Sequence, residues 1–251
     1  RNFIILVNIA NYLLDLTKQK LGKPEKLQIE DKWILSKYNS ALKRVTKFFN
    51  DYRLDETILD IENLFILLSR DYIKYVRERA TNNKRALEVL SFVYSGILQM
   101  LAPVCPFITD YLWKKIRKDV ESVHLSEWPK FNDSEIDEDL EKEFEAAQKV
   151  IEAGLKERDS KSIGLKWPLK KAQVECDTPI RKEILEIIKN QINVKEIYFN
   201  FSEKNINVSL DFEMSPELEA EGFAREIARR VQAERKNKGM EKKERINLVL
   251  A

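Results

Sequence analysis

The sequence is poor in the residues that build most metal and nucleotide sites. Its 251 residues include 2 cysteines, 1 histidine and 6 glycines. Two cysteines and one histidine cannot supply a four-ligand Cys/His zinc site or a disulfide framework. So few glycines leave little material for a loop that wraps around a phosphate. The composition therefore predicts no metal site and no nucleotide-cradling loop, and a reducing cytoplasm is the simplest location.

Long hydrophobic runs and a charge of one sign are also missing. The opening apolar run, 3–7, is too short to span a bilayer and carries no signal-peptide cleavage pattern, so we predict no membrane association. The chain has 44 basic and 42 acidic residues, a net charge of +2. Because no general basic field surrounds the protein, a nucleic-acid site would have to be a local patch.

No catalytic motif stands out. There is no nucleophile elbow and no paired-histidine motif, and carboxylates cannot be assigned acid and base roles without a cleft. His124 lies beside Ser122 and Ser126, but a serine neighbour without a second histidine does not make a triad. We therefore predict no catalytic residue and a structural role for His124.

The first half of the chain has the periodicity of packed helices. Hydrophobic residues make up 43% of the chain and recur there at spacings of three and four. We predict helices over 2–20 (closed by Gly22 and Pro24), 30–52, 55–81 (with Asp55 as N-cap), 83–102, 106–118 and 136–157. Because proline does not suit a helix interior, Pro103 and Pro106 should bend one apolar rod into a hairpin with both limbs buried.

Within these helices the buried stripes can be predicted residue by residue. On the second limb of the hairpin the residues predicted to be buried are Phe107, Tyr111, Leu112 and Ile116. On the helices 30–52 and 55–81 they include Tyr52 and Ile58 at their margins.

The second half changes to a mixed pattern. After an extended segment over 122–128, we predict strands over 172–176, 194–201 and 206–212, a helix over 180–190, and a strand beginning at Arg245. Ser215 and Pro216 should open a last helix that ends at Gly239, with Ala220, Phe223, Ile227 and Val231 facing inward. The predicted fold is mainly α: an antiparallel helix bundle (1–135), a connecting helix (136–159) and a small α+β domain (160–251) that is truncated at its end.

The remaining indication of function is a set of basic faces on individual helices. Lys37, Arg44 and Lys47 fall opposite the apolar arc of their helix, and a second row, at i, i+4 and i+7, comprises Arg70, Lys74 and Arg77. A basic stretch over 156–171 contains Arg158, Lys166, Trp167 and Lys170, and the last helix carries Arg225, Arg229 and Lys236. Such surfaces suit RNA, in which cations hold phosphates and aromatic rings stack on unpaired bases. Solvated or salt-bridged helix faces would give the same pattern, and the helix dipole alone favours the late basic residues of the last helix.

Six strings, in this order, carry a resemblance to a known family. They are DKWILSKYNS (31–40), LAPVCPFITDYLW (101–113), SVHLSEWP (122–129), GLKWPLKK (164–171), NVKEIYF (193–199) and ELEAEGFAREIARRVQAERK (217–236). Together they resemble the C-terminal half of class I aminoacyl-tRNA synthetases, specifically the isoleucyl type of archaea and eukaryotes.

The resemblance implies a non-catalytic, tRNA-binding fragment. The adenylation, transfer and editing sites, and the ATP and Mg that the parent enzyme uses, would belong to domains upstream on the same chain. The partner would be an isoleucine-accepting tRNA. Candidate contacts are Lys37, Arg44, Lys47, Arg70, Lys74 and Arg77 for the stem, and Lys166, Trp167, Lys170 and Arg229 for the anticodon. The alternatives are the equivalent domain of the valyl or leucyl enzymes, or a helical interaction scaffold that binds no RNA.

Overall fold

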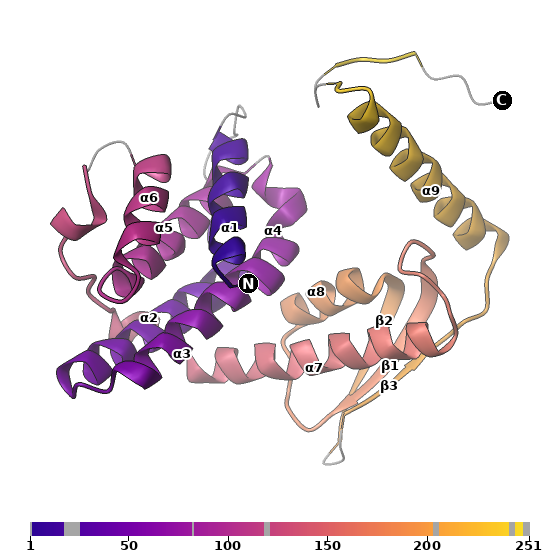
Figure 1. The fold of residues 1–251 in the computed structure, drawn as a ribbon. Helices are drawn as coiled ribbons and strands as arrows, with labels where there is room; N and C mark the ends of the chain where they lie inside the picture. Colours follow the sequence, from indigo (N-terminus) through magenta and orange to yellow (C-terminus); the bar gives the residue numbers. More distant parts are fainter. Residues whose placement is uncertain are drawn as a thin grey trace. The chain divides into compact units, whose positions relative to one another are not determined.

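The computed structural model describes residues 2–17, 26–81, 83–117, 121–202, 206–240 and 244–247. The chain divides into two compact units, residues 1–144 and 145–251. The first unit is helical, and the second combines helices with a small sheet (Figure 1). A mainly helical fold with a small α+β part, as the sequence predicts, is therefore confirmed. Within the described residues, no helix combines the length and apolar character needed to cross a membrane.

The helices of the first unit follow the predicted order. They are α1 (Asn2–Thr17), α2 (Ile29–Asn50), α3 (Leu54–Leu67), α4 (Ile73–Ala80), α5 (Lys84–Leu101), α6 (Pro106–Ile116) and the start of α7 (Glu138–Ser160). The proline break is confirmed, because α5 ends before Pro103 and α6 has Pro106 at its first position. The predicted stop of the first helix at Gly22 and Pro24 lies outside the described residues.

Large side chains from α2, α5 and α7 fill the core of this unit. Trp33 stacks on Phe144 with ring centroids 4.5 Å apart. Tyr38 lies so close to Gly96 of α5 that a Cβ at residue 96 would be 2.4 Å from the phenol. Glycine is therefore the residue that lets α2 and α5 approach at this point, and burial raises the pKa of Tyr38 to about 12.

A buried polar cluster anchors the start of α2. Asp31, fully buried, accepts hydrogen bonds from Tyr72 Oη at 2.7 Å and from the guanidinium of Arg79 at 2.8 and 3.0 Å. Arg79 also donates to Glu30 at 2.6 Å, and the Asp31 carboxylate accepts from Gln28 N at 2.9 Å in a capping box. The paired charges satisfy one another, which is the condition for burying them.

The third predicted helix is interrupted. A π-helical turn, Leu68–Tyr72, separates α3 from α4. An ordinary helix turns by about 100° per residue, and a π turn holds one residue more than an α turn. This turn therefore brings Ile73, Val76 and Ala80 back onto the buried side that α3 sets with Ile61 and Phe65. The prediction that Asp55 caps this helix is wrong, since Arg53 is the N-cap residue and makes no side-chain cap bond.

Several predicted core residues are at the surface instead. The exposed fraction is 90% for Phe107, 53% for Tyr111, 88% for Tyr52 and 40% for Ile58. Helix α6 buries a narrower stripe than predicted, which consists of Thr109, Leu112 and Trp113. Tyr52 lies two residues beyond the end of α2, in the left-handed region with φ of 57°, so its side chain leaves the helical arc.

The second unit is built on a three-stranded sheet. The strands are β1 (Leu169–Cys176), β2 (Val194–Phe201) and β3 (Asn207–Leu210), in the order β2-β1-β3. Strand β1 pairs in parallel with β2 and antiparallel with β3. Helix α8 (Lys182–Ile192) joins β1 to β2 and buries Ile184, Ile188 and Ile192. The sequence therefore predicted all three strands and this helix to within a few residues.

The last helix, α9 (Pro216–Asn237), begins as predicted but packs differently. Ser215 Oγ accepts from Leu218 N at 3.4 Å, and Pro216 follows as the first helical residue. In α9 the buried residues are Leu218 and Gly222, while Phe223 is 52% exposed and Ile227 39%. The predicted inward face is therefore wrong, because Ala220, Phe223 and Ile227 are all exposed.

Two short predictions also need correction. Val123–Leu125 forms a single 3-10 turn within the segment expected to be extended. Residues 244–247 contain no strand, and the rest of the strand predicted from Arg245 lies outside the described residues.

Candidate nucleic-acid interface

The cations of the row Arg70, Lys74 and Arg77 are all exposed. None of the three forms an ion pair with a carboxylate in the part of the chain that the structure describes. Asp71 lies beside them, and burial raises the pKa of its carboxyl group, although the charges of Lys74 and Arg70 oppose this. The row therefore offers exposed positive charge without an ion-pair partner among the described residues, with Asp71 as an acidic neighbour, where the π-helical turn passes into α4.

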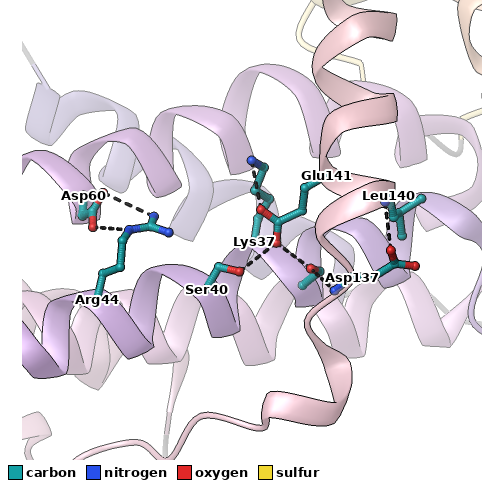
Figure 2. Close-up of polar contacts among 8 residues, drawn as sticks. Lys37, Ser40, Arg44, Asp60, Asp137, Leu140 and Glu141 are labelled. Atoms are coloured by element: carbon teal, nitrogen blue, oxygen red, sulfur yellow. Dashed lines mark hydrogen bonds and ion pairs between the residues drawn. The ribbon is translucent and has the colours of Figure 1, made fainter. Parts of the chain in front are cut away.

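The basic face of α2 is partly neutralised, as Figure 2 shows. Arg44 makes two hydrogen bonds to the carboxylate of Asp60 on α3, at 2.7 and 3.3 Å. Lys37 Nζ lies 3.1 Å from Glu141 Oε2, and its side chain is only 21% exposed. Lys47, by contrast, is exposed and has no ion pair among the described side chains.

The same carboxylate that holds Lys37 also fixes the start of α7 against α2. Glu141 Oε1 accepts from Ser36 Oγ at 2.5 Å and from Ser40 Oγ at 2.8 Å. Asp137 N donates to Ser36 Oγ at 2.9 Å, and Asp137 Oδ1 caps the amide of Leu140 at 2.9 Å (Figure 2). This side of α2 therefore serves packing as well as charge.

In the second unit two of the candidate residues, Lys166 and Arg229, contact one acidic side chain of α9. Glu226 accepts from Arg229 at 2.7 Å, from Arg230 at 3.0 Å and from Lys166 at 3.2 Å. These three donors hold the pKa of the Glu226 carboxyl far below its ordinary value. Three cations around one carboxylate leave an excess of positive charge at this point, and Arg229 remains 71% exposed.

Trp167 is half-buried and packs against α9. Its ring meets Phe223 edge-on with centroids 5.1 Å apart, and a Cβ at Gly222 would lie 2.0 Å from it. Lys166 Nζ lies 5.2 Å from the centroid of the same ring. The neighbouring Lys170 is exposed, with no ion pair to any carboxylate that the structure describes. The contacts of Trp167 make it a packing anchor for α9 as well as a candidate for stacking.

Arg158 differs from the other residues of the basic stretch because it is 1% exposed. Its guanidinium donates to the carbonyl oxygens of Ile192 and Asn193, both at 2.8 Å, of Trp167 at 3.0 Å and of Gly164 at 3.4 Å. Burial, together with the charge of Arg225, lowers its pKa to about 10, so it stays charged at neutral pH. The side chain ties the loop before β1 to the turn between α8 and β2.

Two of these features were not predicted from the sequence. The burial of Arg158 has no local signal, because a basic stretch normally lies in solvent. Glu226 could have been found, since it precedes Arg229 and Arg230 by three and four residues, which is the spacing of helical ion pairs.

The arrangement can hold anions. Exposed cations without carboxylate partners are suited to phosphate groups. No group of three or more histidine, cysteine, aspartate or glutamate side chains that could hold a metal ion occurs among the described residues.

Comparison with known proteins decides the family. A family model described as the anticodon-binding domain of tRNA ligase matches residues 31–174, which is more than half of the chain. The chain belongs to this anticodon-binding family. Residues 31–174 include all but the first two residues of α2, the helices from α3 to α7, the row Arg70, Lys74 and Arg77, and also Lys166, Trp167 and Lys170.

Individual relatives point to one kind of tRNA ligase. The isoleucine–tRNA ligase of Pyrococcus furiosus is 31% identical over 243 residues, which is 90% of this chain and 23% of the relative. That of Methanopyrus kandleri is 34% identical over 184 residues, 69% of this chain and 17% of the relative. A bacterial relative, from Clostridium tetani, is 30% identical over 207 residues, 78% of this chain and 20% of the relative. The chain thus spans about a fifth of the length of the curated relatives it matches, and this member of the anticodon-binding family is similar to their isoleucine-specific type.

Proposed function

We propose that this chain is the tRNA-binding, anticodon-recognising part of an isoleucine–tRNA ligase. The parent enzyme would attach isoleucine to its tRNA with ATP and Mg, in catalytic and editing domains on the same polypeptide. The observation that carries the proposal is the match of residues 31–174 to the anticodon-binding family. The exposed cations of the π-helical turn and α4, which have no ion-pair partner among the described residues, support it from the structure.

The proposed organisation follows the division expected from the sequence. Residues 1–135 would form an antiparallel anticodon-binding bundle of the class I synthetase type, 136–159 a connecting helix, and 160–251 a junction domain that helps to hold the anticodon loop. The bundle and the junction domain each carry part of the cationic surface described above, so each would contact RNA.

The contacts to phosphate would come from the exposed basic residues of the first unit. Arg70, Lys74, Arg77 and Lys47 are the strongest candidates, because none of them forms an ion pair with a carboxylate among the described residues. Lys37 and Arg44 would have to exchange or share Glu141 and Asp60 with a phosphate group. Lys166, Trp167, Lys170 and Arg229 would meet the anticodon loop in the junction domain.

The test is a titration of isoleucine-accepting tRNA against the 251-residue chain at several salt concentrations. Replacing Arg70, Lys74 and Arg77 together by glutamine should weaken binding. It should also make the slope of log K against log salt less steep, by roughly 0.9 for each phosphate that the variant no longer neutralises. Unchanged affinity and slope would remove this row from the interface.

A matched control keeps the total charge change the same. Arg53, Lys84 and Lys142 are exposed, lie on other parts of the first unit, and are each paired with a carboxylate three or four residues away. Their combined replacement by glutamine should leave the salt slope within error of the wild-type value. An equal effect of both triple variants would mean that overall charge, rather than the row on α4, governs binding.

Two further comparisons address the alternatives. Binding of isoleucine, valine and leucine tRNAs under identical conditions separates the isoleucyl assignment from the valyl and leucyl ones. An affinity for total tRNA that is negligible at low salt would refute RNA binding and favour a helical interaction scaffold.

A further inference from the structure

Helix α6 carries an exposed aromatic stripe that neither the core nor the proposed phosphate contacts use. Phe107 is 90% exposed and Tyr111, four residues later, is 53% exposed. Lys115, a further four residues along, places its Nζ 4.6 Å from the centroid of the Tyr111 ring. Residues four apart on a helix are neighbours on one face, so the three side chains form a continuous row, here called the α6 stripe.

The surroundings of the α6 stripe are held in place by contacts on two sides of the helix. At its start, His124 Nε2 lies 3.3 Å from Pro106 O. On the flank, Asp110 accepts from Ser122 Oγ at 2.5 Å and from Lys114 Nζ at 2.8 Å, and these bonds lower the pKa of its carboxyl group. Asp110, the acidic side chain of α6, is therefore already hydrogen-bonded, and contacts with residues 122–124 hold the helix in place.

The charge around the α6 stripe favours a polyanion. Of the four charged residues from Pro106 to Arg117, the three basic ones are Lys114, Lys115 and Arg117. Lys114 balances Asp110, so basic residues outnumber acidic ones in this segment. A second cation contacts an aromatic ring here, since the guanidinium of Arg117 lies 5.4 Å from the Trp113 ring centroid.

We propose that Phe107, Tyr111 and Lys115 form a stacking site for unpaired bases of an RNA loop, with Lys115 beside the adjoining phosphate. Aromatic rings stack on bases of any sequence, and a cation next to the ring binds the backbone, which is how single-stranded RNA is usually held. The site rests on the proposed function and adds to it a surface for loop bases that is distinct from the phosphate row on α4.

A helical row of two rings that ends in a cation fits a nucleotide better than a protein. Stable protein interfaces bury about 800 Å² on each partner, with a broad apolar centre. The α6 stripe is instead flanked by the charged pair of Asp110 and Lys114 and ends in a lysine. A flat base needs only one exposed ring face, which Phe107 offers almost completely.

The experiment uses the 251-residue chain and the anticodon stem-loop of an isoleucine-accepting tRNA, with 2-aminopurine at single loop positions. Replacing Phe107 and Tyr111 together by alanine should lower affinity by roughly 5- to 150-fold per stacked base and abolish fluorescence quenching at one or more positions. The slope of log K against log salt should stay unchanged, because stacking releases no counterions. Tyr111→Phe, which keeps the ring, should retain both affinity and quenching.

The control is Phe3→Ala, since Phe3 of α1 is also an exposed aromatic residue of the first unit, at 51%. It should bind like the wild type. Wild-type affinity and quenching in the Phe107/Tyr111 variant would overturn the stacking site. If the glutamine variants on α4 still weaken binding in that case, the proposed function stands, whereas failure of the wild-type chain to bind the stem-loop refutes both.

Discussion

Replacing Arg158 by methionine should destabilise the second unit strongly, although it removes no contact to a charged partner. Methionine keeps most of the length and apolar stem of arginine but none of its donors. Four carbonyl oxygens then lose the guanidinium: those of Gly164, Trp167, Ile192 and Asn193.

The size of the destabilisation depends on how many of these carbonyl oxygens keep another hydrogen-bond donor when Arg158 is replaced. Gly164 O still accepts from Trp167 N, and Asn193 O from Leu169 N, each at 3.1 Å. For Ile192 O and Trp167 O no second donor occurs among the described residues. A buried polar group left unpaired costs about 1–3 kcal/mol, so two cost about 2–6 kcal/mol. Because a buried charge no longer has to be desolvated, we expect the free energy of unfolding to fall by about 2–4 kcal/mol.

Hydrogen exchange provides the assay, since it reports the two units separately. Amides of β1, β2 and α8 should exchange faster in Arg158→Met, while those of α2 and α5 serve as the internal reference. Arg158→Lys should also be destabilised, because one ammonium group cannot reach all four carbonyls on the two segments. Lys156→Met, an exposed change two residues earlier in α7, should stay within about 0.5 kcal/mol of the wild type. A similarly small effect of Arg158→Met would refute the reasoning.

Two further predictions concern a close contact and a titration. Gly96→Ala should lower the free energy of unfolding by about 1–3 kcal/mol, because the new Cβ would press against the Tyr38 ring. In a Tyr38→Leu background the same substitution should destabilise the protein less. If thermal unfolding shows that the two substitutions destabilise additively, the contact is contradicted. Glu226 should titrate well below the ordinary glutamate pKa of about 4.3 in a carboxyl-carbon NMR titration, since Arg229, Arg230 and Lys166 hold it ionised. The stabilisation that ionised Glu226 provides should therefore be complete above about pH 4.3, the unfolded-state pKa, and should be lost as the pH falls toward the lower folded-state pKa. A titration midpoint of Glu226 near the ordinary value of about pH 4.3 would disprove the pairing.

The sequence predicted the elements well because their signals are local. The proline pair, the Ser215–Pro216 start and the β-branched strands each act within a few residues, and all reappear in the structure. Burial was predicted less well at helix margins. Phe107 and Phe223 lie on apolar faces by periodicity, yet whether another element covers such a face depends on residues distant in the sequence.

The pairing of charged residues also depends on residues distant in the sequence, so it was predicted even less well than burial. Periodicity placed Arg44 and Arg70 on basic helix faces, but it could not show that Asp60 pairs with the first while the second remains without a carboxylate partner among the described residues. Arg79 and Arg158 look like surface cations in the sequence and are instead structural, because partners 48 and 34 residues away surround them. Which cations are available to bind RNA is therefore decided by tertiary contacts.

The π-helical turn Leu68–Tyr72 gives this part of the chain an asymmetric tolerance of changes in length. Deleting one residue there would let the turn become an ordinary α-helix while the residues that follow keep their orientation, because a π turn holds one residue more than an α turn. Ile73 and Val76 would stay on the buried side, and Arg79 would stay beside Asp31. Inserting one residue in α4 should be far more harmful, because it would rotate everything after it by about 100°.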